Sequence, residues 1–253
     1  SPYPRALSAI VRAFRDAEAD HHIIGRLVPA IDREAEPAAA TQMVDWVLQH
    51  RVDDVVGIGI DYREVDHPPE WFAEAFAMAR RGGLKTTAHA GEFGMSWTNV
   101  RTAVELLRVD RIDHGYTAID EPEFARACAE RGIVFTVVPT NSHYLRTLAP
   151  ERWALDHPIR HMPGFGLRVH PNTDDPTLHH VTPTRAWSMM VRDFGFGLND
   201  LRDFMDNGLD GAWIDDTTRC RWRAEWRQHF DAARARFEAR DADGVPTSDG
   251  QGS

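Results

Sequence analysis

Apolar and polar positions along this chain follow a repeating alternation of helix and strand patterns. Leu7, Val11 and Phe14 share one helical face and predict an opening amphipathic helix. Further helical patterns each precede a short apolar or β-branched run. The expected helices lie at 37–49, 69–81, 98–107, 122–131 and 156–162, and the expected strands at 23–31, 55–60, 84–88, 111–113, 133–138 and 167–170. This order predicts an α/β fold with a parallel sheet wrapped by helices.

Helical patterns alone follow the last expected strand. They lie at 184–191, 198–207 and 215–240, where Trp222, Trp226 and Phe230 recur every four residues. We expect these helices to pack against the sheet as its last covering layer. Residues 1–240 would then form a single domain, which we expect to be the catalytic one. Residues 241–253 lack apolar anchors and predict a disordered tail.

Composition narrows the class of protein. A net charge of −10 disfavours binding to nucleic acid or anionic membranes, which needs a surplus of Lys and Arg, and a small molecule is the expected partner. Cys128 and Cys220 stand far apart, so neither a disulfide framework nor a thiolate metal cluster is expected. Without an apolar run of about 18 residues or a signal pattern, a cytoplasmic location is expected. Assembly of this chain into a homo-oligomer is a possibility that the sequence leaves open.

Chemically active side chains follow three of the expected strands. His89 and Glu92 come after the third strand, His114 after the fourth, and the pair Asp174–Asp175 after the sixth. Each has a plain structural alternative: a buried core histidine, a helix-capping acid, or an Asx turn before a proline. Together at the carboxyl-terminal edge of one parallel sheet, however, these side chains make up the inventory of a hydrolytic metal site.

Four motifs in this order resemble those of the adenosine and adenine deaminase family, from near residue 1 to about Ile214. The motifs are His89-Ala90-Gly91-Glu92, Arg111-Ile112-Asp113-His114-Gly115, Val138-Pro139-Thr140-Asn141-Ser142 and Asn172-Thr173-Asp174-Asp175-Pro176. The segment 56–61, followed by His67-Pro68-Pro69, is closer to the adenine deaminase branch. Tyr62-Arg63 and the segment 139–144 depart from that branch near the substrate, which favours a modified purine as an alternative.

The resemblance implies a (β/α)8 barrel of the amidohydrolase kind that removes the amino group of a 6-aminopurine with one zinc ion. His89 and Asp174 would be zinc ligands, and Glu92 would be a carboxyl, protonated at working pH, that protonates ring nitrogen N1. His114 would support the attacking hydroxide. Asp175 would bind N7 of the purine, and Asp61 and Gly91 would line the rest of the ring.

The start of the chain departs from the family pattern, which takes two more zinc ligands from a His-x-His motif on its first strand. No such motif precedes His89; His21 and His22 are adjacent and are expected at the surface. We therefore expect a barrel without its first two strands and with two protein ligands for zinc. Deamination of adenine or of a modified adenosine such as aminodeoxyfutalosine remains open, as does a metal-free purine-binding protein. The missing Pro-Cys-x-x-Cys and Gly-x-Ser-x-Gly patterns exclude cytidine-type deaminases and serine hydrolases.

Overall fold

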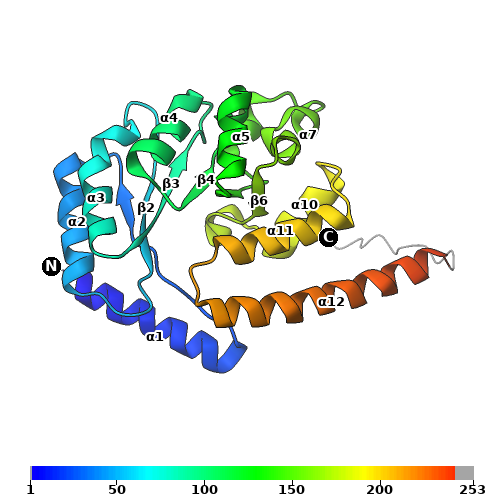
Figure 1. Cartoon of the computed structure of the whole chain (residues 1–253), viewed down its shortest axis with the longest axis horizontal. Coiled ribbons are helices and arrows are strands. Elements are labelled where there is room, and N and C mark those ends of the chain that lie inside the picture. The colour runs from blue at the N-terminus through cyan, green and yellow to red at the C-terminus, as the bar shows by residue number, and fades with distance from the viewer. Residues whose placement is uncertain (1, 243–253) are drawn as a thin grey trace.

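The computed structural model describes residues 2–242, which are built around a six-stranded parallel sheet (Figure 1). The strands lie side by side in chain order, and β1 and β6 form the two edges. They are β1 (Ala30–Asp32), β2 (Gly57–Asp61), β3 (Lys85–Ala90), β4 (Arg111–His114), β5 (Val134–Val137) and β6 (Arg168–Pro171). The predicted α/β class and all six expected strands are confirmed.

Helices connect the strands and cover the sheet, as a parallel arrangement requires. The α-helices are α1 (Tyr3–His21), α2 (Pro37–Gln49), α3 (Ala73–Arg81), α4 (Trp97–Thr102), α5 (Pro122–Glu130), α6 (Ser142–Thr147), α7 (Trp153–Asp156), α8 (Pro158–His161), α9 (Pro176–His179), α10 (Pro183–Arg192), α11 (Leu198–Gly211) and α12 (Asp216–Ala242). Shorter turns are η1 (Pro69–Phe72), η2 (Ala103–Leu107), η3 (Tyr116–Asp120) and η4 (Met162–Phe165), of which η2 is a π-helix. None of these helices carries an apolar stretch long enough to cross a membrane.

The hydrophobic core lies between the strands and the helices that follow them. Ile58 of β2, Ile112 of β4 and Phe135 of β5 are fully buried on the sheet, and Val44 of α2 and Phe76 of α3 are fully buried on the helices. Burial of this kind explains the continuous β-branched runs in the sequence, since a parallel strand covered on both sides carries apolar residues on both faces. The core therefore fixes the strands in place, and their carboxyl ends share one edge.

Several expected boundaries were wrong. The expected strand at 23–31 contracts to β1 because Ile23 and Ile24 stay exposed, with only an isolated bridge from Leu27 to Val55 before it. Strand β3 continues to Ala90, so His89 belongs to the strand and not to the loop after it. His114 likewise ends β4. Helices α6 and α9, which carry no clear amphipathic pattern, were not expected.

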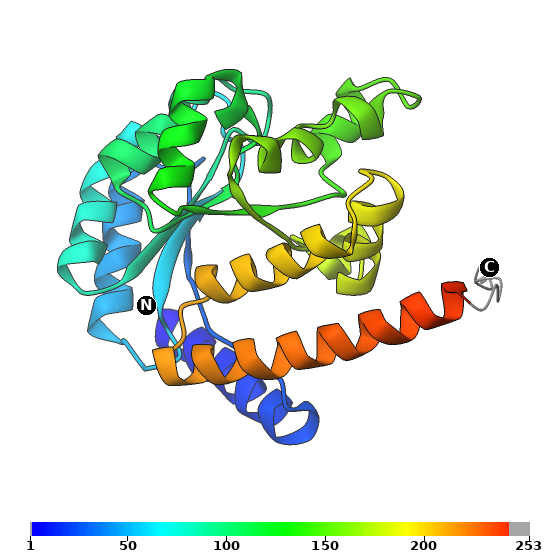
Figure 2. The ribbon, with the colours of Figure 1, turned by 45° about the vertical axis from the view of Figure 1, so that its right-hand side comes forward.

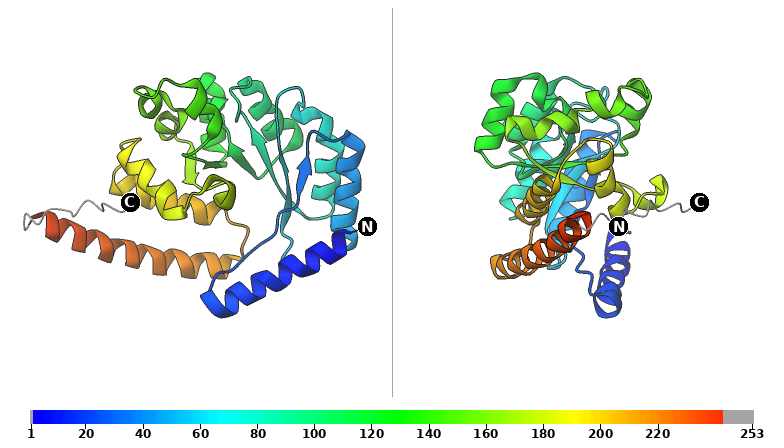
Figure 3. Two further views of the ribbon diagram at one scale, coloured as in Figure 1. Left: turned by 180° about the vertical axis from the view of Figure 1, so that it is seen from behind. Right: turned by 90° about the vertical axis from the view of Figure 1, so that its right-hand side faces the viewer.

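The carboxyl-terminal helices pack at the β6 side of the sheet. Helix α11 contacts β6 and β5, and α12 runs alongside α11, joined to it by ion pairs such as Arg223–Asp206 (Figure 2). Views from behind and from the side show α1 and α12 at the same end of the molecule (Figure 3). His21 and His22 are exposed, as expected. The predicted tail falls mostly outside the described residues, although residues 241 and 242 continue α12.

Candidate active site at the carboxyl ends of the strands

The sheet brings the predicted site residues together by its register. His89 of β3 is paired with Asp113 of β4, and Ala90 is paired with His114. Glu92 follows two residues after β3 and turns back toward both histidines. Its Oε2 atom lies 3.8 Å from His89 Nδ1 and 3.5 Å from His114 Nε2, and the two histidine rings are 4.6 Å apart. Three polar groups from two neighbouring strands thus form one compact cluster.

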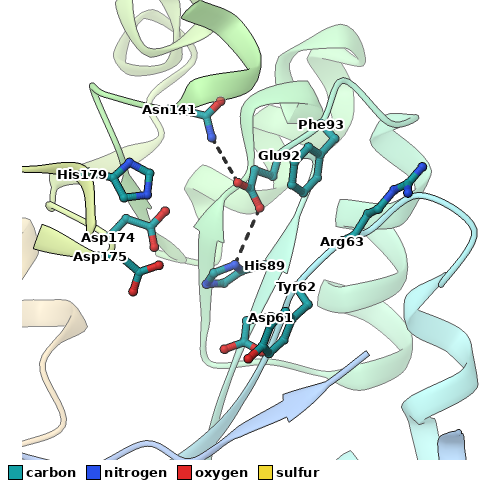
Figure 4. Close-up of a pocket in the computed structure, with 10 residues that line it drawn as sticks. All are labelled: Asp61, Tyr62, Arg63, His89, Glu92, Phe93, Asn141, Asp174, Asp175 and His179. Atoms are coloured by element: carbon teal, nitrogen blue, oxygen red, sulfur yellow. Dashed lines mark hydrogen bonds and ion pairs between the residues drawn. The ribbon is translucent and has the colours of Figure 1, made fainter. Parts of the chain in front are cut away.

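Asn141 completes the surroundings of Glu92. Its side-chain nitrogen donates to Glu92 Oε1 at 3.2 Å, while its Oδ1 atom accepts from the amides of His143 and Tyr144 at the start of α6 (Figure 4). Asn141 is nearly fully buried. The helix start therefore fixes the amide orientation, and the amide fixes the carboxylate of Glu92. Sequence reasoning placed Asn141 within a motif but gave it no role.

Charges in this cluster favour a cation at the position of His89. Burial lowers the His89 pKa, but the pairing with Glu92 and the charges of Asp113 and Asp174 outweigh it and raise that pKa to about 9. Burial lowers the pKa of His114 to about 4, against the attraction of Glu92, so its imidazole is neutral. Positive charge is thus stabilised at one ring and excluded from its neighbour.

Glu92 is a carboxylate in these surroundings. Burial raises its pKa, but His89, His114 and Asn141 together lower the pKa below the ordinary value for a glutamate. The expectation of a carboxyl group held protonated by its environment is therefore not met by the residues described. The reason is that both histidines lie within 4 Å of the carboxylate, which the sequence alone does not reveal.

A cavity of about 420 Å³ opens in front of this cluster, a volume typical of small-molecule sites. Five of the predicted site residues line it, namely Asp61, His89, Glu92, Asp174 and Asp175 (Figure 4). The other lining residues are Tyr62, Arg63, Phe93, Asn141 and His179. Of these, Tyr62, Arg63 and Asn141 belong to the segments that depart from the family pattern, and Phe93 and His179 carry no signal in the sequence. Polar groups on three sides suit a flat heterocycle that carries several nitrogen atoms.

Asp61 lines this cavity with a carboxyl group that is partly buried. Burial raises its pKa to about 6, and its Oδ1 atom is buried without a hydrogen-bond partner in the described part of the chain. A buried acceptor without a donor is costly, which favours the neutral form of this carboxyl group.

Two predicted residues lie elsewhere. His114 lines an adjoining hollow of about 300 Å³ together with His89 and Asp174. Gly91 does not line the main cavity, and its amide donates to Glu64 behind the site. Its φ of +68° and the 2.5 Å separation that a Cβ would have from Thr117 Oγ1 explain why a glycine stands there.

A metal ion could be held by His89, Glu92 and His114, or by His89 together with Asp174. Ligand atoms of His89, Glu92 and His114 all lie within 4.8 Å of one another. Asp174, the second ligand implied by the sequence, is outside that group but faces the same cavity as His89. Imidazole and carboxylate are both zinc ligands, and the negative surroundings of His89 favour a cation. The residues present therefore fit a zinc ion.

Comparison with known proteins gives consistent results. The adenosine deaminase family model matches residues 4–226. A crystal structure of an amidohydrolase from Burkholderia ambifaria with bound Zn is 58% identical, with a TM-score of 0.93, over 94% of this chain and 66% of that one. An adenine deaminase from Sphingopyxis alaskensis is 32% identical over 87% of this chain and 63% of its own length. An aminodeoxyfutalosine deaminase from Acidothermus cellulolyticus is 34% identical over 82% and 58%, respectively. This chain thus spans about three fifths of the length of these curated relatives.

Proposed function

Because the chain belongs to the adenosine deaminase family, whose model matches residues 4–226, we propose that it serves the hydrolytic deamination of a 6-aminopurine. In this reaction the oxygen of water bonds to C6, the C6–N bond breaks, and ammonia leaves the 6-oxopurine. The observation that carries the proposal is the position of Glu92, which contacts both histidines and Asn141 at the wall of the cavity that Asp174 and Asp175 also line.

Zinc held by His89 and Asp174 would supply the Lewis acidity that activates water at neutral pH. Glu92 moves the proton. As a carboxylate it accepts a proton from the attacking water and passes it to N1 of the ring, which makes C6 more electrophilic. Asn141 holds Glu92 Oε1, so that Oε2 stays directed at the two histidines.

The remaining residues orient the reactants. His114, whose low pKa keeps it neutral, presents Nε2 near Glu92 and can accept a hydrogen bond from the water. Asp175 would bind the N7 side of the purine, and the carboxyl group of Asp61 would bind a ring N–H. A purine held from two sides has its C6 atom fixed next to His89, and such positioning accounts for much of the rate in hydrolytic enzymes.

The substrate proposal is adenine itself. Tyr62 follows Asp61 at the cavity wall, where its bulky ring would leave less room for an N9 ribosyl group than a small side chain. A free base also has an N–H group that Asp61 can bind. A modified adenosine such as aminodeoxyfutalosine is the second candidate, because one similar protein bears that name and because Arg63 lines the same wall.

One experiment tests both the chemistry and the substrate. The zinc-supplied protein is assayed for ammonia release from adenine, adenosine and aminodeoxyfutalosine, beside Glu92→Gln and the exposed control Glu70→Gln. We expect adenine to react fastest. Turnover should fall by about 100-fold or more in Glu92→Gln, with zinc content unchanged, and stay normal in Glu70→Gln.

Two outcomes contradict the proposal. Adenosine reacting tenfold faster than adenine would overturn the substrate assignment. Purine binding without ammonia release, in protein that carries zinc, would show a binding protein and not a deaminase.

A further inference from the structure

Glu64 is a buried carboxylate behind the catalytic cluster that does not line the cavity. It lies in the connection between β2 and η1 and is only 1% exposed. Its Oε1 atom accepts from the amide of Gly91 at 3.0 Å and from the side chain of Asn99 at 2.9 Å, and its Oε2 atom accepts from the amide of Glu92 at 3.1 Å. Both oxygens of Glu64 therefore bind the segment that carries Glu92.

Arg33 holds the same segment from the other side. This residue follows β1, is fully buried, and donates from Nη1 to the carbonyl oxygen of His89 at 2.9 Å. Burial lowers the pKa of Arg33, and the charge of Glu64 is the leading effect that opposes this. Arg33 and Glu64 thus each hold the backbone of this segment by hydrogen bonds, Arg33 at the carbonyl of His89 and Glu64 at the amides of Gly91 and Glu92.

The segment is also confined by packing. Gly91 has left-handed backbone geometry, and a Cβ there would lie 2.9 Å from Val100 Cγ2 in addition to its clash with Thr117. Between Ala90 at the end of β3 and Trp97 at the start of α4, no regular helix or strand orders the backbone. Hydrogen bonds from Gly91 and Glu92 to Glu64 are thus what sets the direction in which the Glu92 side chain leaves the backbone.

We propose that Glu64 is the positioning residue that holds the backbone of residues 89–92, with Arg33 fixing the carbonyl of His89, so that Glu92 meets His89 and His114. This inference rests on the proposed function for its kinetic consequence only. A displacement of about 1 Å in a catalytic group costs roughly 100-fold in rate, so loss of Glu64 should lower kcat while the cavity walls that determine KM stay in place.

Glu64→Gln is the sharpest perturbation, because it keeps the size of the side chain. One oxygen becomes an NH₂ group, which faces a backbone or side-chain donor whichever way the amide turns. Glu64→Asp keeps the charge but is one methylene shorter, and should fall between Gln and the native residue. Glu70→Gln, which changes an exposed glutamate of the neighbouring η1 turn, is the matched control.

The native protein and its variants are measured in two ways. Hydrogen exchange detected by mass spectrometry reports amide protection in peptides that cover 89–96 and, for comparison, the β4 and β5 strands. In Glu64→Gln, we expect the backbone amides of residues 89–96, and only these, to exchange about tenfold or more faster. Loss of a hydrogen bond to a charged acceptor has an effect of this size. We expect kcat to fall about 10- to 100-fold with KM within about threefold.

The outcomes separate this proposal from the proposed function. If no purine is deaminated even by the native protein, the exchange experiment still decides whether Glu64 holds the segment. Unchanged exchange in 89–96 overturns the proposal, and so does faster exchange that is equal in all peptides, which indicates general destabilisation. Local exchange that rises while kcat stays native also overturns it.

Discussion

His157 is a buried histidine whose surroundings exclude its charged form. It stands at the start of α8, where its Nδ1 atom accepts from the amide of Ile159 at 3.2 Å. Its ring is fully buried against the aromatic rings of Tyr116, Tyr144, Trp153 and Phe194. Protonation would place an N–H group opposite another N–H group in an apolar setting. Burial accordingly lowers the pKa of His157 to about 3.

This shift makes the folding free energy depend on pH. The pKa of an unfolded histidine is about 6.5, so at pH 5 the unfolded chain binds a proton at His157 that the folded chain does not. The stabilisation is present above about pH 6.5 and is lost as the pH falls toward 3. Between pH 7 and pH 5, this one residue accounts for a loss of about 2 kcal/mol in the free energy of unfolding.

Urea unfolding at both pH values measures the loss. In His157→Asn the side-chain oxygen can still accept from the amide of Ile159, as a good helix cap does, but the residue no longer titrates. We expect the decrease in stability from pH 7 to pH 5 to be about 2 kcal/mol smaller in this variant than in the native protein. The exposed control His229→Asn should behave as native. Other buried histidines, such as His114, contribute equally to the pH dependence of both proteins, so their contributions cancel in the comparison.

Equal losses in the native protein and in His157→Asn would refute the reasoning, since no other residue differs between them. A variant that is less stable at pH 7 but shows the native pH dependence has the same meaning, because packing would then be the only contribution of the ring.

Two further substitutions test the geometry around Glu92. Gly91→Ala should lower the free energy of unfolding by about 1–3 kcal/mol and reduce turnover, because the backbone has a φ of +68° and the added Cβ would clash with Thr117. Thermal unfolding and ammonia release measure these effects, and Gly164→Ala, where a Cβ meets no other atom, is the control. Asn141→Ala should lower kcat by about tenfold through loss of its bond to Glu92 and leave bound zinc unchanged in a metal assay; native kcat would show that the amide does not orient Glu92.

The alternation of apolar runs was sufficient to predict the sheet. Six strands in a parallel sheet and the boundaries of α2 followed from the residue pattern, whereas the order of the strands in the sheet comes from the structure. Because strands of a parallel sheet end at one edge, the expectation that His89, Glu92 and Asp174 share a cavity also followed, and the structure brings them together. Their individual catalytic roles remain predictions.

The sequence pattern could not predict contacts that depend on the direction of a side chain. Arg33 and Glu64 are charged residues without a motif, and the sequence gives no sign that both are buried beside one segment. The low pKa of Glu92 depends on distances to two histidines from different strands. Asn141 stands within a motif of the family, which is a visible signal, but its role as the cap of α6 could not be predicted because that helix was not expected.

Backbone strain at the site is the feature that sequence patterns hide most completely. Tyr62, His114 and Asp174 have φ values of +67°, +67° and +56°, although none of them is glycine. Such conformations cost about 1–3 kcal/mol and persist only where surrounding contacts enforce them. His114 is the last residue of β4 and is paired with Ala90 of β3. Its left-handed backbone changes the course of the chain at the end of the strand, and its Nε2 atom lies 3.5 Å from Glu92 Oε2. A glycine at these positions would relieve the strain but would remove the side chain. The strain at Tyr62 and Asp174 in the cavity and at His114 in the adjoining hollow therefore indicates that their side chains, and not only the course of the backbone, are what the fold maintains.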